Sequence, residues 1–417
     1  MRILVYPHSM EVGGSQLNAI ELAGAVRDRG HEVLVLSDAG SLVDVVDRLG
    51  LEWIPVDPRA SRRPSATVVR QLRELTGRRG FDVLHGYEWP PGVEAFLAAR
   101  GGTAAACTVM SMAVAPFLPR TMPLLVGTED LRAGAASAGH RSVTLLEPPV
   151  DVVANAPSFP AGDFRAAHGL DSRMPLVVVV CRLVPELKLE GLLAACHAVG
   201  SLAAAGTPVQ LAVVGDGAAR DQVSEAAAKA NAQAGRTAVV LTGQLADPRP
   251  AYAAADVMLG MGGSALRALA FAKPLVVQGE CGFWSLLTAQ TQPVFLRQGW
   301  YGVGSDVDGR VAGAARLAEI LRPLLLDVDR RSELGQLGRD LVVGRFSLQA
   351  AAALLEQVYT AAVADAARSR RSTVDTLGTI GGVARHKLSR KWQRWRGTVA
   401  TDDFNAVASP NSRGGRT

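Results

Sequence analysis

Cysteine is scarce in this 417-residue chain, and the cysteines that occur stand far apart. The four are Cys107, Cys181, Cys196 and Cys281. None belongs to a Cys-x-x-Cys pair, and no histidine stands beside one at the spacing of a zinc site. We therefore expect single thiols in a reducing compartment, with no disulfide and no structural zinc.

Long hydrophobic runs are also missing. The longest unbroken apolar stretch, Met174 to Cys181, is far below the roughly 20 residues that a membrane span needs. The apolar start, Arg2 to Tyr6, is too short for a secretory signal and is expected to form a strand. We predict a cytoplasmic protein in which no segment crosses a bilayer.

Most of the chain has no excess of charge. Charged residues make up 20% and hydrophobic residues 48%, which is typical of a globular protein. The net charge is +5, but residues 367–417 hold eleven Arg and Lys against three Asp, so this tail carries +8 and the rest −3. A basic tail on an acidic body argues against binding to nucleic acid.

The sequence does contain a regular alternation of strand-like and helix-like segments. The expected strands are 2–6, 32–36, 83–85, 176–180, 210–214 and 238–241, and the expected helices include 16–29, 187–205 and 218–231. This alternation predicts βαβ units with a parallel sheet. The length predicts two domains, which we expect to be doubly wound and Rossmann-like.

Prolines mark the expected boundary between the domains. Residues 147–151 read Glu-Pro-Pro-Val-Asp, and Pro157 and Pro160 follow. The apolar residues of this segment show no helical or strand periodicity. The predicted organisation is a first domain at 1–150, a linker at 151–160, a second domain at 161–345, a helix at 346–366 and a basic tail at 367–417. Because ligands of open α/β sheets bind outside the carboxyl ends of the strands, we expect the two parallel sheets to face each other across a cleft.

A pair of cations follows the expected strand 176–180. Arg182 stands at the end of this strand, and Lys188 stands six residues on, at the start of the next helix. A guanidinium can bond two oxygens of a diphosphate, and an ammonium adds a point charge. Both charges would stabilise a departing diphosphate. Solvated surface charge is the alternative interpretation.

Glycine-rich turns could hold the same anion, because free amides at a helix N-terminus bind phosphate. The candidate residues are Gly13, Gly14, Gly262, Gly263, Ser264, Ala265 and Arg267. The first turn is not the G-x-G-x-x-G of dinucleotide-binding folds, and a tight turn alone is its alternative. For Ser264 the alternative is a simple helix cap.

Taken together, residues 1–366 resemble the retaining GT-B glycosyltransferases of family four. The resemblance rests on Gly-Gly-Ser-Gln at 13–16, Arg-Gly-His-Glu-Val at 29–33, Asp-Val-Leu-His at 82–85, the Arg182 to Lys188 stretch and Gly-Arg-Phe-Ser at 344–347. It implies transfer of a hexosyl-type unit from an NDP-sugar with retention, without a metal ion or other cofactor. The helix at 346–366 would cross back onto the first domain.

The resemblance also implies roles for individual residues. The implied catalytic residues are Arg182, Lys188 and His85; the implied donor-binding residues are Gly13, Gly14, Gly243, Gln244, Leu245, Gly262, Gly263, Ser264, Ala265, Arg267 and Glu280; the implied acceptor-binding residues are Gln16, Tyr87 and Glu88. The turn at 243–245 would pass the nucleobase. A buried histidine bonded to backbone is the alternative for His85.

Several positions depart from the family pattern. Met110 replaces a histidine that contacts the transferred sugar, and a thioether cannot replace its hydrogen bonds. Leu259 and Arg267 replace two glutamates; Arg267 could add a third cation, and Glu280 could offer the missing carboxylate. Two rival functions therefore remain, a non-catalytic sugar-nucleotide-binding protein and a GT-B-fold NDP-sugar epimerase.

The basic tail lies outside the resemblance. Its apolar residues Ile380, Val383, Leu388, Trp392 and Trp395 recur at three- to five-residue steps among basic residues. A helix over 379–396 with this pattern suits an anionic membrane surface, on the inner face of the membrane. A solvated or disordered tail is the alternative, and the last 20 residues are predicted to be disordered. A cell-envelope lipid, a glycan or a small molecule would serve as acceptor.

Overall fold

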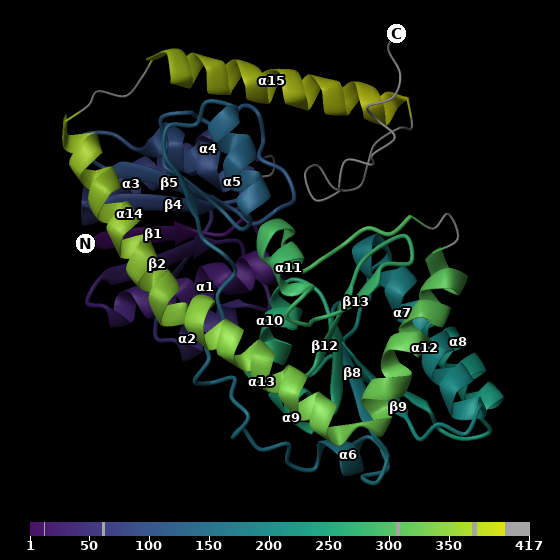
Figure 1. Ribbon diagram of the computed structural model, residues 1–417. Helices are drawn as coiled ribbons and strands as arrows, with labels where there is room; N and C mark the ends of the chain where they lie inside the picture. Colours follow the sequence, from purple (N-terminus) through teal and green to yellow (C-terminus); the bar gives the residue numbers. More distant parts are fainter. Residues whose placement is uncertain (12, 61–62, 306–308, 369–372, 397–417) are drawn as a thin grey trace. The chain divides into compact units, whose positions relative to one another are not determined.

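The structure is a computed structural model that describes residues 1–11, 13–60, 63–305, 309–368 and 373–396 (Figure 1). The chain forms two compact units. Unit 1 contains Met1–Pro148 and the chain from Leu348 onward, and unit 2 contains Pro149–Ser347. The predicted disorder of the last 20 residues concerns 398–417, which lie outside the described residues.

Unit 1 contains a parallel sheet with the strand order β3-β2-β1-β4-β5-β6-β7 among the described residues. Its strands are β1 (Arg2–Tyr6), β2 (Glu32–Ser37), β3 (Glu52–Pro55), β4 (Val83–Tyr87), β5 (Ala104–Val109), β6 (Leu124–Val126) and β7 (Val143–Leu145). Ile3 and Val5 pack in one core cluster, and Leu4 and Tyr6 pack in another. Both faces of β1 are thus buried, which explains its continuous apolar sequence.

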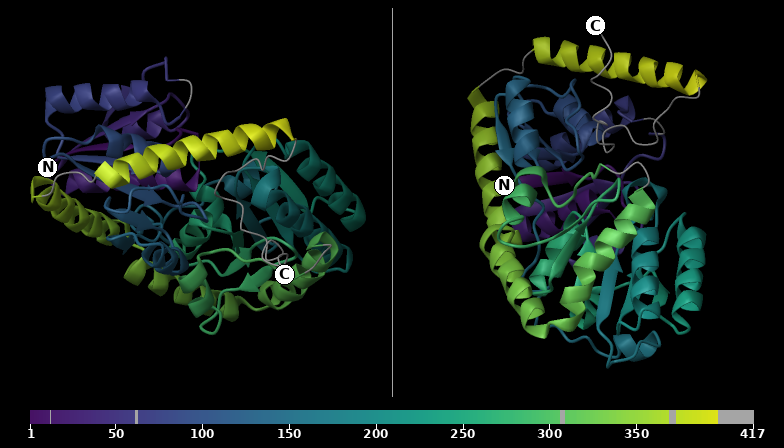
Figure 2. Two further views of the ribbon diagram at one scale, coloured as in Figure 1. Left: turned by 90° about the horizontal axis from the view of Figure 1, so that it is seen from above. Right: turned by 45° about the vertical axis from the view of Figure 1, so that its right-hand side comes forward.

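Helices cover the sheet of unit 1. They are α1 (Gly14–Asp28), α2 (Val43–Arg48), α3 (Ala66–Arg79), α4 (Trp89–Ala98), α5 (Glu129–Ser137), α14 (Leu348–Arg368) and α15 (Thr373–Trp395). In α14, Leu355 and Tyr359 belong to the same core cluster as Ala19 and Ala23 of α1. Two views show α15 as a separate layer along the helices of this unit (Figures 1 and 2).

Unit 2 contains a sheet with the strand order β10-β9-β8-β11-β12-β13 in the described part of the chain. Its strands are β8 (Leu176–Val180), β9 (Gln210–Val214), β10 (Val239–Gly243), β11 (Val257–Gly260), β12 (Leu275–Gln278) and β13 (Trp284–Leu286). Neighbouring strands are parallel, except that β12 and β13 are antiparallel. The residues of β8 alternate between two core clusters, with Val177 and Val179 in one and Leu176 and Val178 in the other.

The helices of unit 2 lie on both faces of this sheet. They are α6 (Phe164–Ala167), α7 (Pro185–Ala204), α8 (Arg220–Ala234), α9 (Arg249–Ala254), α10 (Gly263–Ala270), α11 (Gln292–Gln298), α12 (Gly309–Leu326) and α13 (Val328–Arg345). By length and composition alone α7 could cross a membrane, but Leu192, Cys196 and Val199 are fully buried in the core of unit 2. The helix is therefore a core helix. The prediction of two Rossmann-like α/β domains is confirmed.

The segment predicted as a linker, 151–160, belongs to unit 2. Arg339 on α13 donates hydrogen bonds to the carbonyls of Val152 and Asn155, at 2.9 and 3.0 Å. The chain enters and leaves this unit side by side, since the amide of Val150 donates to the carbonyl of Phe346 at 2.8 Å.

Candidate functional site

Most of the residues predicted to hold a sugar donor lie at one edge of the sheet of unit 2. Arg182 and Lys188 follow β8, Gly262 to Ala265 and Arg267 follow β11, Glu280 follows β12, and Gly243 to Leu245 end and follow β10. Strands β8, β11 and β12 are neighbours, and their carboxyl ends meet at the same edge because they are parallel. The structure thus brings these residues together, whereas Gly13 and Gly14 belong to unit 1.

The turn after β9 fixes the backbone on both sides of Arg182. The amide of Leu183 donates to the carbonyl of Asp216 at 2.9 Å, and the amide of Cys181 donates to β9 at 3.1 Å. Gly215 and Gly217 have φ of +140° and +152°, and a Cβ on either would overlap a carbonyl oxygen of this segment. Only glycine fits there. The guanidinium of Arg182 is exposed on a fixed backbone.

Lys188 stands where α7 becomes regular. Leu187 has a φ of +63°, which is unusual for a leucine and marks a kink just before Lys188. The side-chain amide of Gln278, at the end of β12, donates to the carbonyl of Lys188. The carboxylate of Glu190 accepts hydrogen bonds from the amides of Gly282 at 2.7 Å and Cys281 at 3.2 Å. These contacts hold the start of α7 against the turn after β12.

The charges of the two cations are not paired within the described part of the chain. Neither Arg182 nor Lys188 has an ion-pair partner among the residues that the structure describes. Burial is the main cause that lowers the pKa of Lys188 to about 8, and the nearby charge of Arg182 acts in the same direction. A buried ammonium beside a guanidinium is stabilised by a bound anion, and a diphosphate supplies two charged groups.

The turn before α10 offers backbone amides. Gly262, with a φ of +56°, is the N-cap, and its own amide donates to the carbonyl of Trp300 at 2.8 Å. The alternative interpretation of Ser264 as a simple helix cap is wrong, because Ser264 lies inside the first turn and its hydroxyl donates to the carbonyl of Met261 at 3.0 Å. The first-turn amides of Gly263 to Ala265 have no partner within the helix, so they can bind an anion.

The other predicted donor residues differ in their burial and in their hydrogen-bond partners. The side chain of Ala265 is fully buried, so only its amide can reach a ligand. The carbonyl of Gly243 accepts from the amide of Gly215 at 2.9 Å, which joins the turns after β9 and β10. Glu280 accepts a hydrogen bond from the hydroxyl of Tyr301. Arg267 is half-buried in α10, where its charge acts on the hydroxyl of Tyr252. Gln244 is exposed and Leu245 half-buried beside them.

In unit 1 the structure corrects the prediction for His85. This side chain is fully buried, and its two ring nitrogens bond the hydroxyls of Tyr359 at 2.6 Å and Thr108 at 2.7 Å. Burial lowers the pKa of His85 to about 3, so the ring stays neutral. With both nitrogens engaged, His85 has no atom left for a substrate. It fastens α14 to the sheet of unit 1 instead.

The side chain of Tyr87 is likewise fully buried in the core of unit 1, so it cannot contact an acceptor. Glu88, directly after β4, has a strained φ of +70°. Its carboxylate accepts hydrogen bonds from the hydroxyls of Ser15 at 2.9 Å and Ser111 at 2.5 Å and from the amide of Met110 at 3.0 Å. Glu88 therefore holds together the loops that follow β1, β4 and β5.

The remaining predicted residues of unit 1 surround the start of α1. Gly13 is the N-cap and Gly14 the first helical residue. The side chain of Gln16 folds back over Gly13, and its Nε2 lies 3.1 Å from Nε2 of His8. Gln16 is nearly buried, with an exposed fraction of 8%.

Sequence reasoning missed the residues that position others. Glu190 and Gln278 hold the start of α7, while Ser15 and Ser111 hold Glu88. For Glu190 the proximity to Lys188 was a usable signal. No group of three or more His, Cys, Asp and Glu that could hold a metal ion occurs in the described part of the chain.

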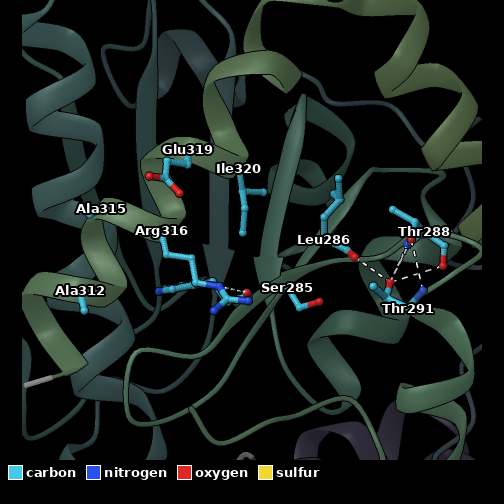
Figure 3. A pocket seen from close by; sticks show the side chains of 10 residues that line it. Ser285, Leu286, Thr288, Thr291, Ala312, Ala315, Arg316, Glu319 and Ile320 are labelled. Carbon is cyan, nitrogen blue, oxygen red and sulfur yellow. Dashed lines mark hydrogen bonds between the residues drawn. The ribbon is translucent and has the colours of Figure 1, made fainter. Parts of the chain in front are cut away.

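A pocket of about 720 Å³ lies elsewhere in unit 2, between β13 and α12 (Figure 3). Arg316 points into it and donates from Nε to the carbonyl of Trp284 at 2.9 Å, and Glu319 lies one turn further along α12. Thr288 and Thr291 on the opposite wall bond each other. None of the predicted donor residues lines this pocket. The candidate site is therefore the edge that carries Arg182 and Lys188.

Comparisons with known proteins give two family matches and a set of shared folds. Residues 13–126 match the family described as "Glycosyl transferase 4-like domain", and residues 174–296 match "Glycosyl transferases group 1". Among curated protein sequences, none matches the chain.

Solved structures with low sequence identity share the fold. A glycosyltransferase from Rickettsia africae ESF-5 aligns with a TM-score of 0.68 at 14% identity, over 87% of this chain and 98% of its own. Anabaena HepE in complex with UDP-glucose aligns with a TM-score of 0.63 at 16% identity, over 87% and 100%. Sucrose-phosphate synthase from Thermosynechococcus elongatus aligns with a TM-score of 0.65 at 17% identity, over the same shares.

Proposed function

The chain belongs to the group 1 glycosyltransferases, and from this premise we propose that it transfers a hexosyl unit from a nucleotide-diphosphate sugar to an acceptor. The observation that carries the proposal is the cation pair Arg182 and Lys188, which has no carboxylate partner in the described residues and lies at the sheet edge with the free amides before α10.

The proposed chemistry follows from these charges. When the bond between the sugar and the diphosphate breaks, its electron pair stays on the phosphate oxygen, and the oxygen of the acceptor hydroxyl forms the new bond as it loses its proton. Arg182 and Lys188 would stabilise the negative charge that develops on the diphosphate. Protein cations would thus supply the charge neutralisation, and we propose transfer without a metal ion and with retention.

A UDP-hexose is the first donor to test. HepE was solved with UDP-glucose, and the family matches make a nucleotide sugar the expected ligand class of unit 2. At such low sequence identity the donor of one protein does not predict the donor of the other, so the experiment tests the other nucleotides at the same concentrations.

A second candidate function has an observation of its own. Met110 stands in the loop after β5, and the ring of His85 is buried with both nitrogens bonded. Unit 1 therefore offers no imidazole that a substrate could contact at these two positions. This favours a protein that binds a nucleotide sugar without transferring the sugar. Formation of an epimer from the donor alone would instead identify an NDP-sugar epimerase.

The first experiment measures thermal stabilisation by UDP, GDP, ADP and their sugars. A ligand at 100 times its dissociation constant should add about 2.7 kcal/mol to the free energy of unfolding. We expect one nucleotide to stabilise the parent but not the Arg182→Ala/Lys188→Ala variant. The control, Arg173→Ala/Lys229→Ala, removes two cations that pair with acidic residues elsewhere in unit 2 and should respond like the parent.

Equal stabilisation of the parent and the Arg182→Ala/Lys188→Ala variant would show that the diphosphate binds elsewhere. Once the nucleotide is known, release of that nucleotide from its sugar, measured with and without an acceptor panel, separates the functions. Acceptor-dependent release supports transfer, whereas binding without turnover supports the non-catalytic protein.

A further inference from the structure

Helix α15 packs on unit 1 through one face. The carboxylate of Asp375 accepts a hydrogen bond from the amide of Thr121 at 2.9 Å, and Thr379 is 2% exposed. One turn on, Gly382 lies against Phe117, leaving no room for a Cβ. The ring of His386 then packs against Phe117, with 5.3 Å between the ring centres. These contacts recur every three or four residues, as one side of a helix does.

The opposite face of α15 is apolar and exposed. Its exposed fractions are Val374 80%, Leu377 66%, Leu388 68%, Trp392 53% and Trp395 83%. At 100° per residue, these five positions fall within an arc of about 60° on the side opposite Thr379. We call these five residues the outer stripe.

The outer stripe cannot belong to the core of unit 1, because the other face of the same helix is the docked one. An amphipathic helix of a globular protein normally turns its apolar side toward the core. A contiguous apolar surface that is left exposed marks an interaction site. The stripe therefore indicates a partner outside unit 1.

Basic residues flank the outer stripe. Arg385 and Arg396 are exposed on one side of it, and Lys391 is exposed on the other. The guanidinium of Arg396 lies 3.5 Å from the ring centre of Trp392. Asp375 is the single acidic residue among 373–395, and it is bonded to Thr121 on the docked face. The partner must therefore combine negative charge with an apolar layer.

We propose that the outer stripe of α15 binds the surface of a bilayer that contains anionic lipids. The apolar side chains enter the boundary between headgroups and acyl chains, the tryptophans lie at headgroup level, and the cations bind anionic headgroups. The helix lies flat on the bilayer and does not span it. The proposal rests on unit 1 alone and is independent of the transfer reaction.

The charges argue against a second copy of the chain as the partner. In a two-fold contact between two outer stripes, Arg385, Lys391 and Arg396 of one copy would face the same cations of the other. Like charges at close range are unfavourable, and such a contact has no acidic residue of α15 to offset them. A bilayer with anionic lipids supplies the opposite charge.

The test is binding of the full chain to vesicles of phosphatidylcholine, with and without phosphatidylglycerol, measured by co-sedimentation. We expect binding to the anionic vesicles that weakens as salt is added, and little binding to the neutral ones. The Leu388→Gln/Trp392→Gln/Trp395→Gln variant should lose the binding. The Lys391→Gln variant should bind about fivefold more weakly, as one cation near an anionic surface contributes.

A matched control separates the outer stripe from general exposure of apolar side chains. Leu326 and Val328 in unit 2 are 67% and 66% exposed, so Leu326→Gln/Val328→Gln removes exposed apolar side chains outside α15 and should bind like the parent. The Trp392→Phe/Trp395→Phe variant should still bind but lose most of the blue shift in tryptophan emission that the parent shows with anionic vesicles.

The triple glutamine variant should unfold at the temperature of the parent, because the replaced side chains are exposed. Three outcomes would overturn the proposal. If the parent bound neutral vesicles as strongly as anionic ones, attraction between the basic residues and anionic headgroups would be excluded. Unchanged binding of the triple variant would exclude the outer stripe. Self-association of the parent without vesicles, lost in the triple variant, would identify a second copy as the partner.

Discussion

The side-chain amide of Gln278 donates a hydrogen bond to the backbone carbonyl of Lys188, with 3.2 Å between nitrogen and oxygen. Gln278 ends β12 and is 1% exposed, and Gly191, one turn into α7, leaves the space that its side chain fills. The position of Lys188 therefore depends on a strand 90 residues further along the chain. Binding at this site should respond to a change at Gln278, even where Gln278 does not contact the ligand.

Replacing Gln278 by leucine should weaken both the fold and nucleotide binding. The carbonyl of Lys188 would lose its donor, which costs roughly 1–3 kcal/mol when the group is buried. We expect the free energy of unfolding in urea to fall by that order and the affinity for the nucleotide diphosphate to fall several-fold. Gln336→Leu, which removes an exposed hydrogen bond to Asp340 on α13, should change neither. A destabilised variant with full affinity would refute the coupling.

Nucleotide binding should weaken as the pH rises through about 8. Burial lowers the pKa of Lys188 to about 8, so its ammonium is charged below that pH and neutral above it. If only the charged form binds the diphosphate, the affinity falls about tenfold per pH unit above this value. Calorimetric titration of the nucleotide between about pH 7 and about pH 9.5 measures this dependence.

Lys188→Arg is the control for that titration. Arginine stays charged over the whole range, so this variant should bind with an affinity that hardly changes with pH. A pH dependence that persists in Lys188→Arg would mean that another group, on the protein or on the ligand, is titrating.

A methyl group on Gly215 should disrupt the anion site through its support. Gly215 has a φ of +140°, and a Cβ there would overlap the carbonyl oxygen of Cys181, next to Arg182. Gly215→Ala should therefore displace the backbone of Arg182 and abolish most of the nucleotide-induced stabilisation. Gly235→Ala, at a φ of +63° with open space around it, adds backbone strain without the clash and should keep the response. A full response in Gly215→Ala would show that the segment tolerates the shift.

The sequence predicted the elements of the fold from local patterns. The apolar run at 176–180 and the arginine after it are enough to place Arg182 at the carboxyl end of a buried strand, because both signals lie within a few residues. The kink at Leu187 and the hydrogen bond from Gln278 to Lys188 could not be predicted, since neither residue type nor spacing indicates them. They arise from contacts between separate strands and helices.

His85 shows the same limit more sharply. Its assignment to a strand was correct, but His85 lies in the middle of β4 and not at its end, and its side chain bonds Tyr359, which is 274 residues away. A histidine in a strand can face a ligand or the interior, and only the packing of α14 decides between the two. The interpretation of Glu88 as an acceptor ligand met the same obstacle, because its three hydrogen-bond donors come from the start of α1 and from the loop after β5.

Glu94 is a buried carboxyl group that no sequence pattern singled out. It lies on α4 with an exposed fraction of 0% and accepts hydrogen bonds from the hydroxyl of Tyr6 at 2.6 Å and the amide of Ser65 at 2.5 Å. Arg63 lies 3.3 Å from it. Burial raises the pKa of Glu94 to about 7, and the charge of Arg63 limits the increase.

The stability of unit 1 should therefore fall as the pH rises from about 4.5 to about 7. The folded state holds a proton on Glu94 that the unfolded chain releases at lower pH, so the stabilisation is complete below the unfolded pKa and lost as the pH passes the folded one. The difference is on the order of 3 kcal/mol. Thermal unfolding at several pH values in this window measures it.

Glu94→Gln removes the titrating group but keeps an oxygen that can accept from Tyr6 and Ser65. Its thermal midpoint should depend less on pH than that of the parent, so that the variant gains on the parent as the pH rises toward 7. The control Glu74→Gln removes an exposed carboxylate from α3 in the same unit and should follow the parent at every pH. Parallel curves for Glu94→Gln and the parent would mean that Glu94 is already ionised in the folded protein at low pH. The interaction with Arg63 would then outweigh burial, and the hydrogen bonds from Tyr6 and Ser65 would be made to a carboxylate.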